Sequence, residues 1–206
     1  IVNGYHVRSS VSKLKPYMGG IDIGLHLFLT DGQPLSHQTA GGGLIDQNGS
    51  LNHFWKLTAN TYFGNLNFES VYDEIRKQIE TFSDLFGEMP DFIDGHKHVQ
   101  QLPVIREALV KVIKDIHIVP YLRIAALPGN WMKNDLLRFS PNLTLNSMMI
   151  NYPGIRAGRL FMKNGLHCNR YLLGYFHIDC QTTFSEIFKL YTSLSPIDRD
   201  IFFCHP

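Results

Sequence analysis

The chain of 206 residues has little cysteine and no marked excess of charge of either sign. Its cysteines, Cys168, Cys180 and Cys204, are odd in number and form no CxxC pair, which argues against a disulfide framework and favours a reducing, cytoplasmic setting. Nineteen Lys and Arg residues against eighteen Asp and Glu residues leave a formal charge of +1, so we expect no nucleic-acid partner. No apolar run approaches the roughly 18 residues that span a bilayer, so we expect no membrane partner either.

Histidine, in contrast, is abundant, with ten residues in the chain. It is the commonest metal ligand among the side chains and titrates nearest to neutral pH. The length and the 44% hydrophobic content are typical of one soluble domain, so we predict a single domain over residues 1–206. The chain starts at Ile1 without a methionine and stops at Pro206, and we expect this domain to be incomplete at both ends.

The hydrophobic pattern predicts strands and helices in alternation. The clearest helix covers 68–86, where Val71, Ile75, Ile79 and Phe82 recur every three or four residues and Asp73, Glu74, Arg76 and Lys77 lie between them. The other predicted helices are 103–116, 155–164 and 184–194, and the predicted strands are 20–30, 91–94, 117–124, 171–178 and 201–204. This alternation is typical of an α/β fold with a parallel sheet, open or closed into a barrel.

Four histidines lie at or near the carboxyl ends of predicted strands: His26, His96, His98 and His205. Active sites of parallel α/β folds form at the carboxyl ends of the strands, so we expect these histidines at one rim. If 94–98 is extended, the spacing Asp94-x-His96-x-His98 puts all three side chains on one face, where they suit a divalent metal. A polar surface loop is the open alternative for this segment. The remaining histidines, such as His53, have no partner that the sequence identifies.

In several ordered segments the chain resembles the YdjC-like carbohydrate deacetylases, the family of chitooligosaccharide deacetylase. These segments are Val2-Asn3-Gly4, Gly24-Leu25-His26-Leu27 with Leu29-Thr30, Gly32-x-Pro34-Leu35, Asp94-Gly95-His96-Lys97-His98-Val99, Leu122-Arg123 and Cys204-His205-Pro206. The resemblance implies a deformed, TIM-like (β/α) barrel related to other polysaccharide deacetylases. It also implies one divalent metal ion, Mg²⁺ or Zn²⁺, held by an aspartate and two histidines, which fall on His26 and His96.

Two departures from the family pattern are visible. The Asp-Asp-Phe-Gly motif that supplies the family's aspartates is absent from this sequence, and Gln100 stands where the family often has a further histidine. An amide cannot transfer a proton as an imidazole does, so any such role for this position is open.

The resemblance implies hydrolysis of N-acetyl groups on amino sugars or chitooligosaccharides. We expect His205 to protonate the leaving amine and Asp94 to orient a metal-bound imidazole. We expect His98 either to support a metal-binding residue from behind or to contact the substrate, and Arg123 to contact the sugar or the oxyanion. Aromatic residues such as Trp55, Tyr62, Phe63 and Trp131 are candidates for stacking on sugars, although core packing is the favoured interpretation of each.

Two other functions stay open: a catalytically inactive sugar-binding or regulatory homologue on the same barrel, and a metal-dependent hydrolase of another substrate. A homo-oligomer is an open alternative to a monomer.

Overall fold

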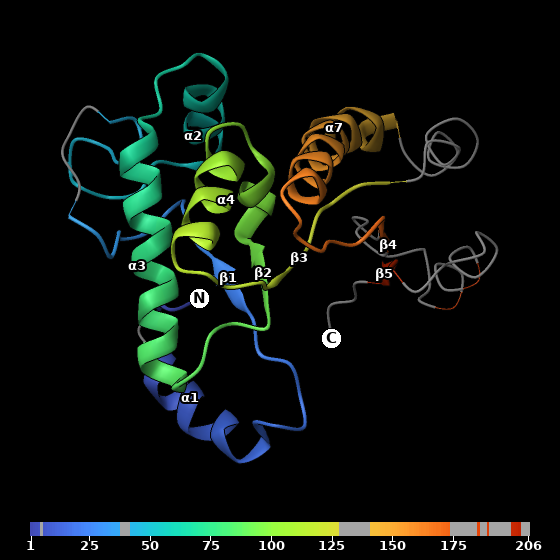
Figure 1. The fold of residues 1–206 in the computed structure, drawn as a ribbon. Coiled ribbons are helices and arrows are strands. Elements are labelled where there is room, and N and C mark those ends of the chain that lie inside the picture. Colours follow the sequence, from blue (N-terminus) through green and yellow to red (C-terminus); the bar gives the residue numbers. More distant parts are fainter. Residues whose placement is uncertain are drawn as a thin grey trace.

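The computed structural model describes residues 1–4, 6–37, 42–127, 141–173 and 199–202, and the single positions 185 and 189. Within these ranges helices alternate with short strands (Figure 1), which confirms the predicted α/β class. The elements in chain order are α1 Val7–Leu14, η1 Lys15–Tyr17, β1 Leu25–Leu27, α2 Phe54–Tyr62, α3 Phe68–Phe86, β2 Phe92–Gly95, η2 His96–Gln101, α4 Ile105–Asp115, β3 Tyr121–Leu122, α7 Pro141–Lys163, β4 Leu172–Leu173 and β5 Ile201–Phe202.

A parallel sheet in the order β1-β2-β3 forms the centre of the described structure. Strand β1 is much shorter than the predicted 20–30 because side chains replace the strand ladder at both of its ends. The Ile23 N–H donates to Oδ2 of Asp91 at 2.7 Å, and the N–H and carbonyl of Phe28 bond to the side-chain amide of Gln78 at 3.0 and 2.7 Å. Backbone groups need partners when they are buried, and these side chains provide them.

The parallel arrangement continues beyond β3. Leu122 forms a parallel bridge with Cys168, the Leu172 N–H donates to the Ala126 carbonyl at 2.8 Å, and β4 pairs in parallel with β5. The described residues thus show a three-stranded sheet and a two-stranded pair, and a closed TIM-like barrel remains a prediction. The predicted helix 184–194 lies outside the described residues apart from positions 185 and 189, which are helical.

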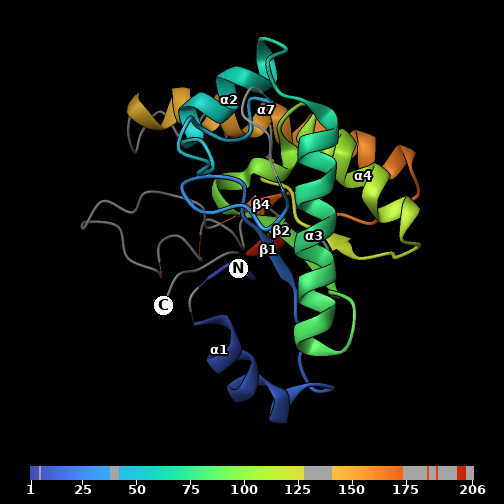
Figure 2. The same cartoon turned by 90° about the vertical axis from the view of Figure 1, so that its left-hand side faces the viewer.

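Helix α3 has the bounds that the three-and-four spacing predicts. Oδ1 of Asn67 accepts from the Ser70 N–H at 2.9 Å and caps the first turn, and Gly87 at φ 82° ends the helix in the left-handed conformation. The pattern placed Glu74 on the polar face, but Glu74 and Gln78 are fully buried. In Figures 1 and 2, α2 lies near the start of α3 and α1 near its end.

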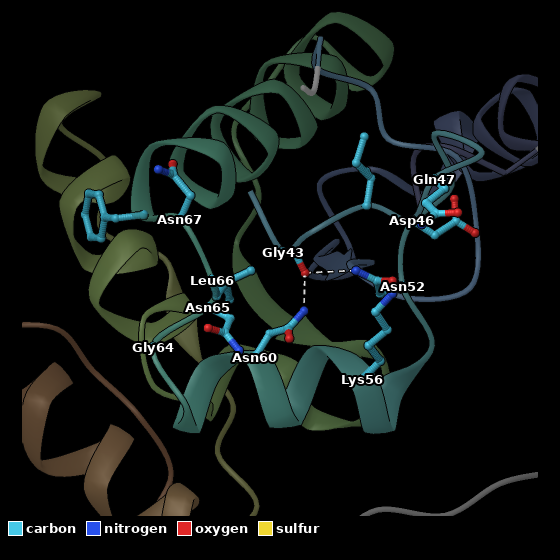
Figure 3. Close-up of a pocket in the computed structure, with 12 residues that line it drawn as sticks. Gly43, Asp46, Gln47, Asn52, Lys56, Asn60, Gly64, Asn65, Leu66 and Asn67 are labelled. Atoms are coloured by element: carbon cyan, nitrogen blue, oxygen red, sulfur yellow. Dashed lines mark hydrogen bonds between the residues drawn. The ribbon is translucent and has the colours of Figure 1, made fainter. Parts of the chain in front are cut away.

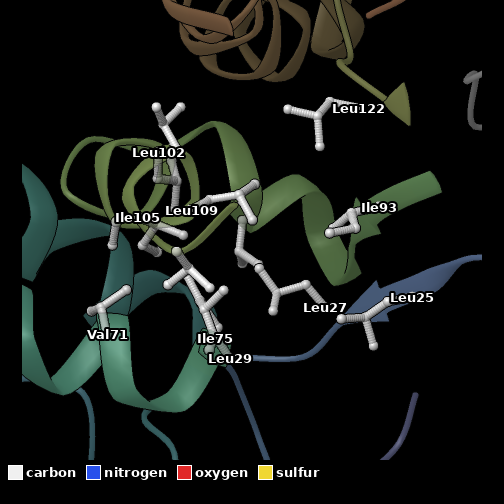
Figure 4. Packing of buried hydrophobic residues seen from close by; sticks show 14 of the residues in the cluster. Leu25, Leu27, Leu29, Val71, Ile75, Ile93, Leu102, Ile105, Leu109 and Leu122 are labelled. Atoms are coloured by element: carbon white, nitrogen blue, oxygen red, sulfur yellow. The ribbon is translucent and has the colours of Figure 1, made fainter. Parts of the chain in front are cut away.

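The hydrophobic core joins the sheet to α3 and α4 (Figure 4). Apolar side chains of the three strands and of the residue Leu29 beyond β1 meet one face of each helix. The buried residues at this contact include Leu25, Leu27, Leu29, Ile93 and Leu122 from the sheet side, Val71 and Ile75 from α3, and Ile105 and Leu109 from α4. All of these are at most 1% exposed. Burial of one such side chain is worth about 1.5–3 kcal/mol, so this core fixes the positions of the strand ends.

Helix α7 is longer than the predicted 155–164 because it continues through Pro153. It packs closely on the segment after β3: a Cβ at Gly154 would lie 2.3 Å from the Ala125 carbonyl oxygen, and one at Gly158 would lie 2.8 Å from Cδ1 of Ile124. At Gly154, where the neighbour is backbone, only glycine permits this approach, so tertiary packing outweighs the hydrogen bond that proline removes. No helix in the described ranges has both the length and the hydropathy of a membrane span.

Helices α1 and α2 were not predicted. In α2 only Leu57 and Thr61 are buried, which leaves little apolar periodicity to detect. The interpretation of core packing was wrong for Trp55, Tyr62 and Phe63, which are 63%, 53% and 79% exposed, and Trp131 lies outside the described residues.

Candidate active site

Strand pairing places His26 of β1 directly opposite Asp94 of β2. The Nδ1–H of His26 donates to Oδ1 of Asp94 at 2.7 Å, and Nη2 of Arg123, the residue after β3, lies 2.5 Å from Oδ2 of Asp94. The parallel sheet therefore aligns an imidazole, a carboxylate and a guanidinium across its three strands.

The charges within this chain of contacts favour an ionised Asp94. Burial alone would raise the pKa of its carboxyl group, but the hydrogen bond from His26 and the positive charge of Arg123 together lower that pKa below its ordinary value. In the neutral ring, an ionised carboxylate keeps the proton of His26 on Nδ1, which leaves the lone pair of Nε2 free to bind a ligand. The side chain of His26 is 33% exposed, so a ligand can reach the ring.

His96 lies beside His26, with the two ring centroids 5.8 Å apart and the rings edge to face. The ring of Phe28 packs against the other side of His96 at 5.3 Å between centroids. Partial burial lowers the pKa of His96, and the neighbouring His26 and the positive charge of Lys97 lower it further. His96 is thereby favoured in the neutral form, which is the form that binds metal ions.

The prediction that Asp94, His96 and His98 share one extended face was wrong. Asp94 belongs to β2, but the chain turns at His96 into η2, where Lys97 and His98 have φ values of 52° and 58°. This turn carries His98 into the interior, and its side chain is buried. Burial, followed by the charge of Arg123, lowers the pKa of His98 to about 3, so this imidazole is neutral.

Gln100 and Arg123 belong to the framework behind these histidines. Nε2 of the fully buried Gln100 donates to the Arg123 carbonyl at 2.7 Å, and a Cβ at Gly95 would lie 2.3 Å from Oε1 of Gln100. Arg123 was expected to contact a sugar or an oxyanion, but its side chain is only 10% exposed and contacts Asp94. Gln100 therefore ties the turn after β2 to the backbone after β3.

We tested the metal site implied by the family resemblance against these donors. Among the described residues, no three His, Cys, Asp or Glu side chains lie close enough together to hold a metal ion. His26 and His96 fit part of such a site because they are adjacent imidazoles, and His26 has the carboxylate partner that metal-bound histidines usually have. His205 lies outside the described residues, so its role stays a prediction.

Sequence reasoning missed a polar cluster at the same edge, formed by Asp31, His53 and Lys97. Nζ of Lys97 lies 2.9 Å from Oδ2 of Asp31 and 5.8 Å from the centroid of the Phe54 ring, and Nδ1 of His53 hydrogen-bonds to Oδ1 of Asp31. The hydrogen bond from Lys97 is the main cause that lowers the pKa of Asp31 to about 2. The negative charge of Asp31 acts to raise the pKa of His96, so the cluster lies beside the histidine pair.

The chain belongs to the YdjC-like protein family, whose model matches residues 1–206. A carbohydrate deacetylase of Danio rerio is 28% identical over 178 residues, covering 84% of this chain and 54% of that protein. A carbohydrate deacetylase of Xenopus laevis is 32% identical over 171 residues, covering 81% and 52%. A chitooligosaccharide deacetylase of Serratia marcescens is 33% identical over 105 residues, covering 51% and 39%. The chain thus spans about half the length, or less, of the curated relatives that it matches.

A solved structure supports the fold. A protein of Enterococcus faecalis, provisionally named a cellobiose-phosphate cleavage protein, matches all of this chain and 68% of its own length with a TM-score of 0.66 and 18% identity. At this identity the likeness shows the fold alone. Family membership confirms the resemblance that the histidine motifs predicted.

Proposed function

We propose that this protein is a metal-dependent hydrolase that removes N-acetyl groups from amino sugars or chitooligosaccharides. Its family and the names of its relatives support the reaction class. The observation that carries the proposal is the chain of contacts from His26 through Asp94 to Arg123, because a histidine oriented by a buried carboxylate is typical of metal sites. A cytoplasmic location is part of the proposal and rests on composition.

His26 and His96 would hold one divalent ion, Mg²⁺ or Zn²⁺, together with a donor beyond the described residues. When bound, such an ion polarises the acetyl carbonyl and lowers the pKa of a water molecule.

Each of these side chains has a distinct task. Asp94 holds the proton of His26 on Nδ1, and Arg123 keeps Asp94 ionised. Partial burial keeps His96 neutral, while packing against Phe28 restricts rotation of its ring. Amide hydrolysis also needs a proton for the leaving amine, and we assign that proton to His205, since an imidazole can donate it near neutral pH.

The test compares metal content and acetate release in three variants. We expect His26→Ala and His96→Ala to lose the bound ion, measured by elemental analysis, and to release no acetate from N,N′-diacetylchitobiose, called chitobiose below, with added Mg²⁺ or Zn²⁺. His6→Ala is the matched control, because the exposed His6 makes no side-chain capping hydrogen bond at the start of α1. Unchanged metal stoichiometry in both site variants would reject the ligand assignment.

A catalytically inactive sugar-binding or regulatory protein is the second candidate. It is favoured by one observation, that the described residues supply fewer than three metal donors. The same assay separates the two candidates: saturable binding of chitobiose without acetate release, in the presence of either metal, would favour the binding protein.

A further inference from the structure

An open pocket of about 830 Å³ lies outside the histidine pair, between the loop 43–52, helix α2 and the start of α3 (Figure 3). Its volume falls within the range of small-molecule sites, which is roughly 300–1,000 Å³. No role that we have assigned uses this pocket.

Hydrogen bonds within the protein hold the walls of the pocket in place. The carbonyl of Gly43 accepts from Nδ2 of Asn52 at 2.9 Å and from Nδ2 of Asn60 at 2.7 Å, which joins the loop to α2 (Figure 3). Gly43 has φ 76°, and a Cβ there would lie 2.1 Å from the Asn65 carbonyl oxygen, so this approach requires glycine. The Asn67 N–H also donates to the Gly42 carbonyl at 2.8 Å. The pocket is therefore formed before any ligand binds.

Side-chain amides are the commonest polar groups of the pocket, carried by five of its twelve lining residues. Within the part of the chain that the structure describes, Gln47, Lys56 and Asn65 line the pocket and their side chains make no hydrogen bond to protein. The carboxylate of Asp46 is engaged by the turn, where its Oδ1 accepts from the N–H groups of Asn48 and Ser50. Amides offer donors and acceptors together, which matches sugar hydroxyl and acetamido groups, whereas one ammonium group is a weak site for a phosphate.

The pocket and the histidine pair share a segment of chain. The carbonyl of Asn52 accepts from the Asp31 N–H at 3.4 Å, and the next residue, His53, hydrogen-bonds to the Asp31 carboxylate. Asp31 in turn pairs with Lys97, the neighbour of His96. The pocket is thus connected through consecutive contacts to the edge of the sheet where His26 and His96 lie.

We propose that this pocket binds a neutral sugar residue of the oligosaccharide, one that does not itself lose its acetyl group at the histidine pair. This inference rests on the proposed deacetylase function and narrows its substrate class to oligosaccharides. A ligand that reaches both places gains contacts that a monosaccharide does not make.

The experiment uses N,N′,N″-triacetylchitotriose, called chitotriose below, and N-acetylglucosamine as probes in isothermal titration calorimetry. The combined variant Gln47→Ala/Lys56→Ala/Asn65→Ala should bind chitotriose about tenfold more weakly than wild type, with N-acetylglucosamine affinity unchanged. The control is Asn48→Ala/Lys77→Ala, which changes an exposed residue of the same turn and an exposed lysine of α3, and it should match wild type.

Equal chitotriose affinity in wild type and the combined variant would overturn the inference, as would a wild type that does not bind chitotriose. Acetate release from the same proteins separates this failure from that of the proposed function. Acetate release with an unchanged KM for chitotriose in the combined variant rejects the pocket alone. Pocket-dependent binding of chitotriose with no acetate release rejects the deacetylase and retains the sugar site.

Discussion

Replacing Glu74 by glutamine tests how α3 holds the loop after β1. The carboxylate of Glu74 is fully buried and accepts hydrogen bonds from four donor groups. The Leu35 N–H donates to both oxygens, at 2.9 Å to Oε2 and at 3.1 Å to Oε1. The N–H and Oγ–H of Ser36 donate to Oε2 at 2.8 and 2.7 Å, and Nε2 of Gln78 donates to Oε1 at 2.8 Å. An ionised carboxylate can meet all four because it only accepts.

Glutamine cannot reproduce this arrangement in either orientation of its amide. An NH₂ group at the Oε2 position faces the backbone N–H groups of Leu35 and Ser36, and at the Oε1 position it faces the NH₂ group of Gln78. Gln78 cannot turn to offer its oxygen without breaking its two bonds to Phe28. One buried donor left without a partner costs about 1–3 kcal/mol, and the other bonds lose their charge assistance.

We therefore expect Glu74→Gln to lower the free energy of unfolding by about 3 kcal/mol, out of a typical total of 5–15 kcal/mol. Urea unfolding measures this loss. Glu80→Gln is the matched control on the same helix, because its carboxylate pairs with Arg76 at the surface and should contribute less than about 0.5 kcal/mol. A loss below about 1 kcal/mol in Glu74→Gln would refute the reasoning.

Three further predictions concern the site and the sheet. Asp94→Asn should lower metal affinity by about ten- to a hundredfold, measured by chelator competition, because His26 loses its ionised partner; unchanged affinity would contradict this role. Gly24→Ala should destabilise the fold by about 1–3 kcal/mol in chemical denaturation, since its Cβ would lie 2.2 Å from the Phe92 ring, and adding Phe92→Leu should recover part of the loss. The lowered pKa of Asp31 means that its contacts stabilise the fold above about pH 4 and are lost as the pH falls toward 2. Wild type should therefore melt above Asp31→Asn at pH 6, by a solvent-screened margin of about 1 kcal/mol or less, and the two melting temperatures should converge near pH 2.

The sequence was sufficient to predict helix α3, the parallel sheet and the closeness of His26 and His96 at its edge. The three-and-four spacing of apolar residues located α3, and the alternation of elements predicted the parallel sheet. A parallel sheet brings the carboxyl ends of its strands together, which is why His26 and Asp94 could be expected near each other although 68 residues separate them. The exact register that pairs them was not predictable, because both strands are buried apolar segments.

Local conformation at the site could not be predicted, because it depends on tertiary contacts. Lys97 and His98 adopt positive φ values that residues other than glycine rarely adopt, and nothing in the letters His-Lys-His indicates such a turn. The pairing of Asp31 with Lys97 joins the loop after β1 to η2, 66 residues further along the chain, and no spacing rule connects them. The burial of Glu74 was hidden for a similar reason, since its partners Leu35 and Ser36 belong to a loop distant in sequence.

The shortness of the strands explains why amides are buried near the candidate site. Strand β3 has only two residues, so the backbone that follows it has few ladder partners. Side-chain amides take their place: Gln100 donates to the Arg123 carbonyl, Asn169 bonds to both the N–H and the carbonyl of Ile124, and Oε1 of Gln101 accepts from the Ala125 N–H. Each of these amides hydrogen-bonds to backbone of the segment after β3, so each one fixes the distance between two segments. The backbone that carries Arg123, and through it the orientation of Asp94, is held by these amides together with one ladder bond, from the Arg123 N–H to the Ile93 carbonyl at 3.1 Å.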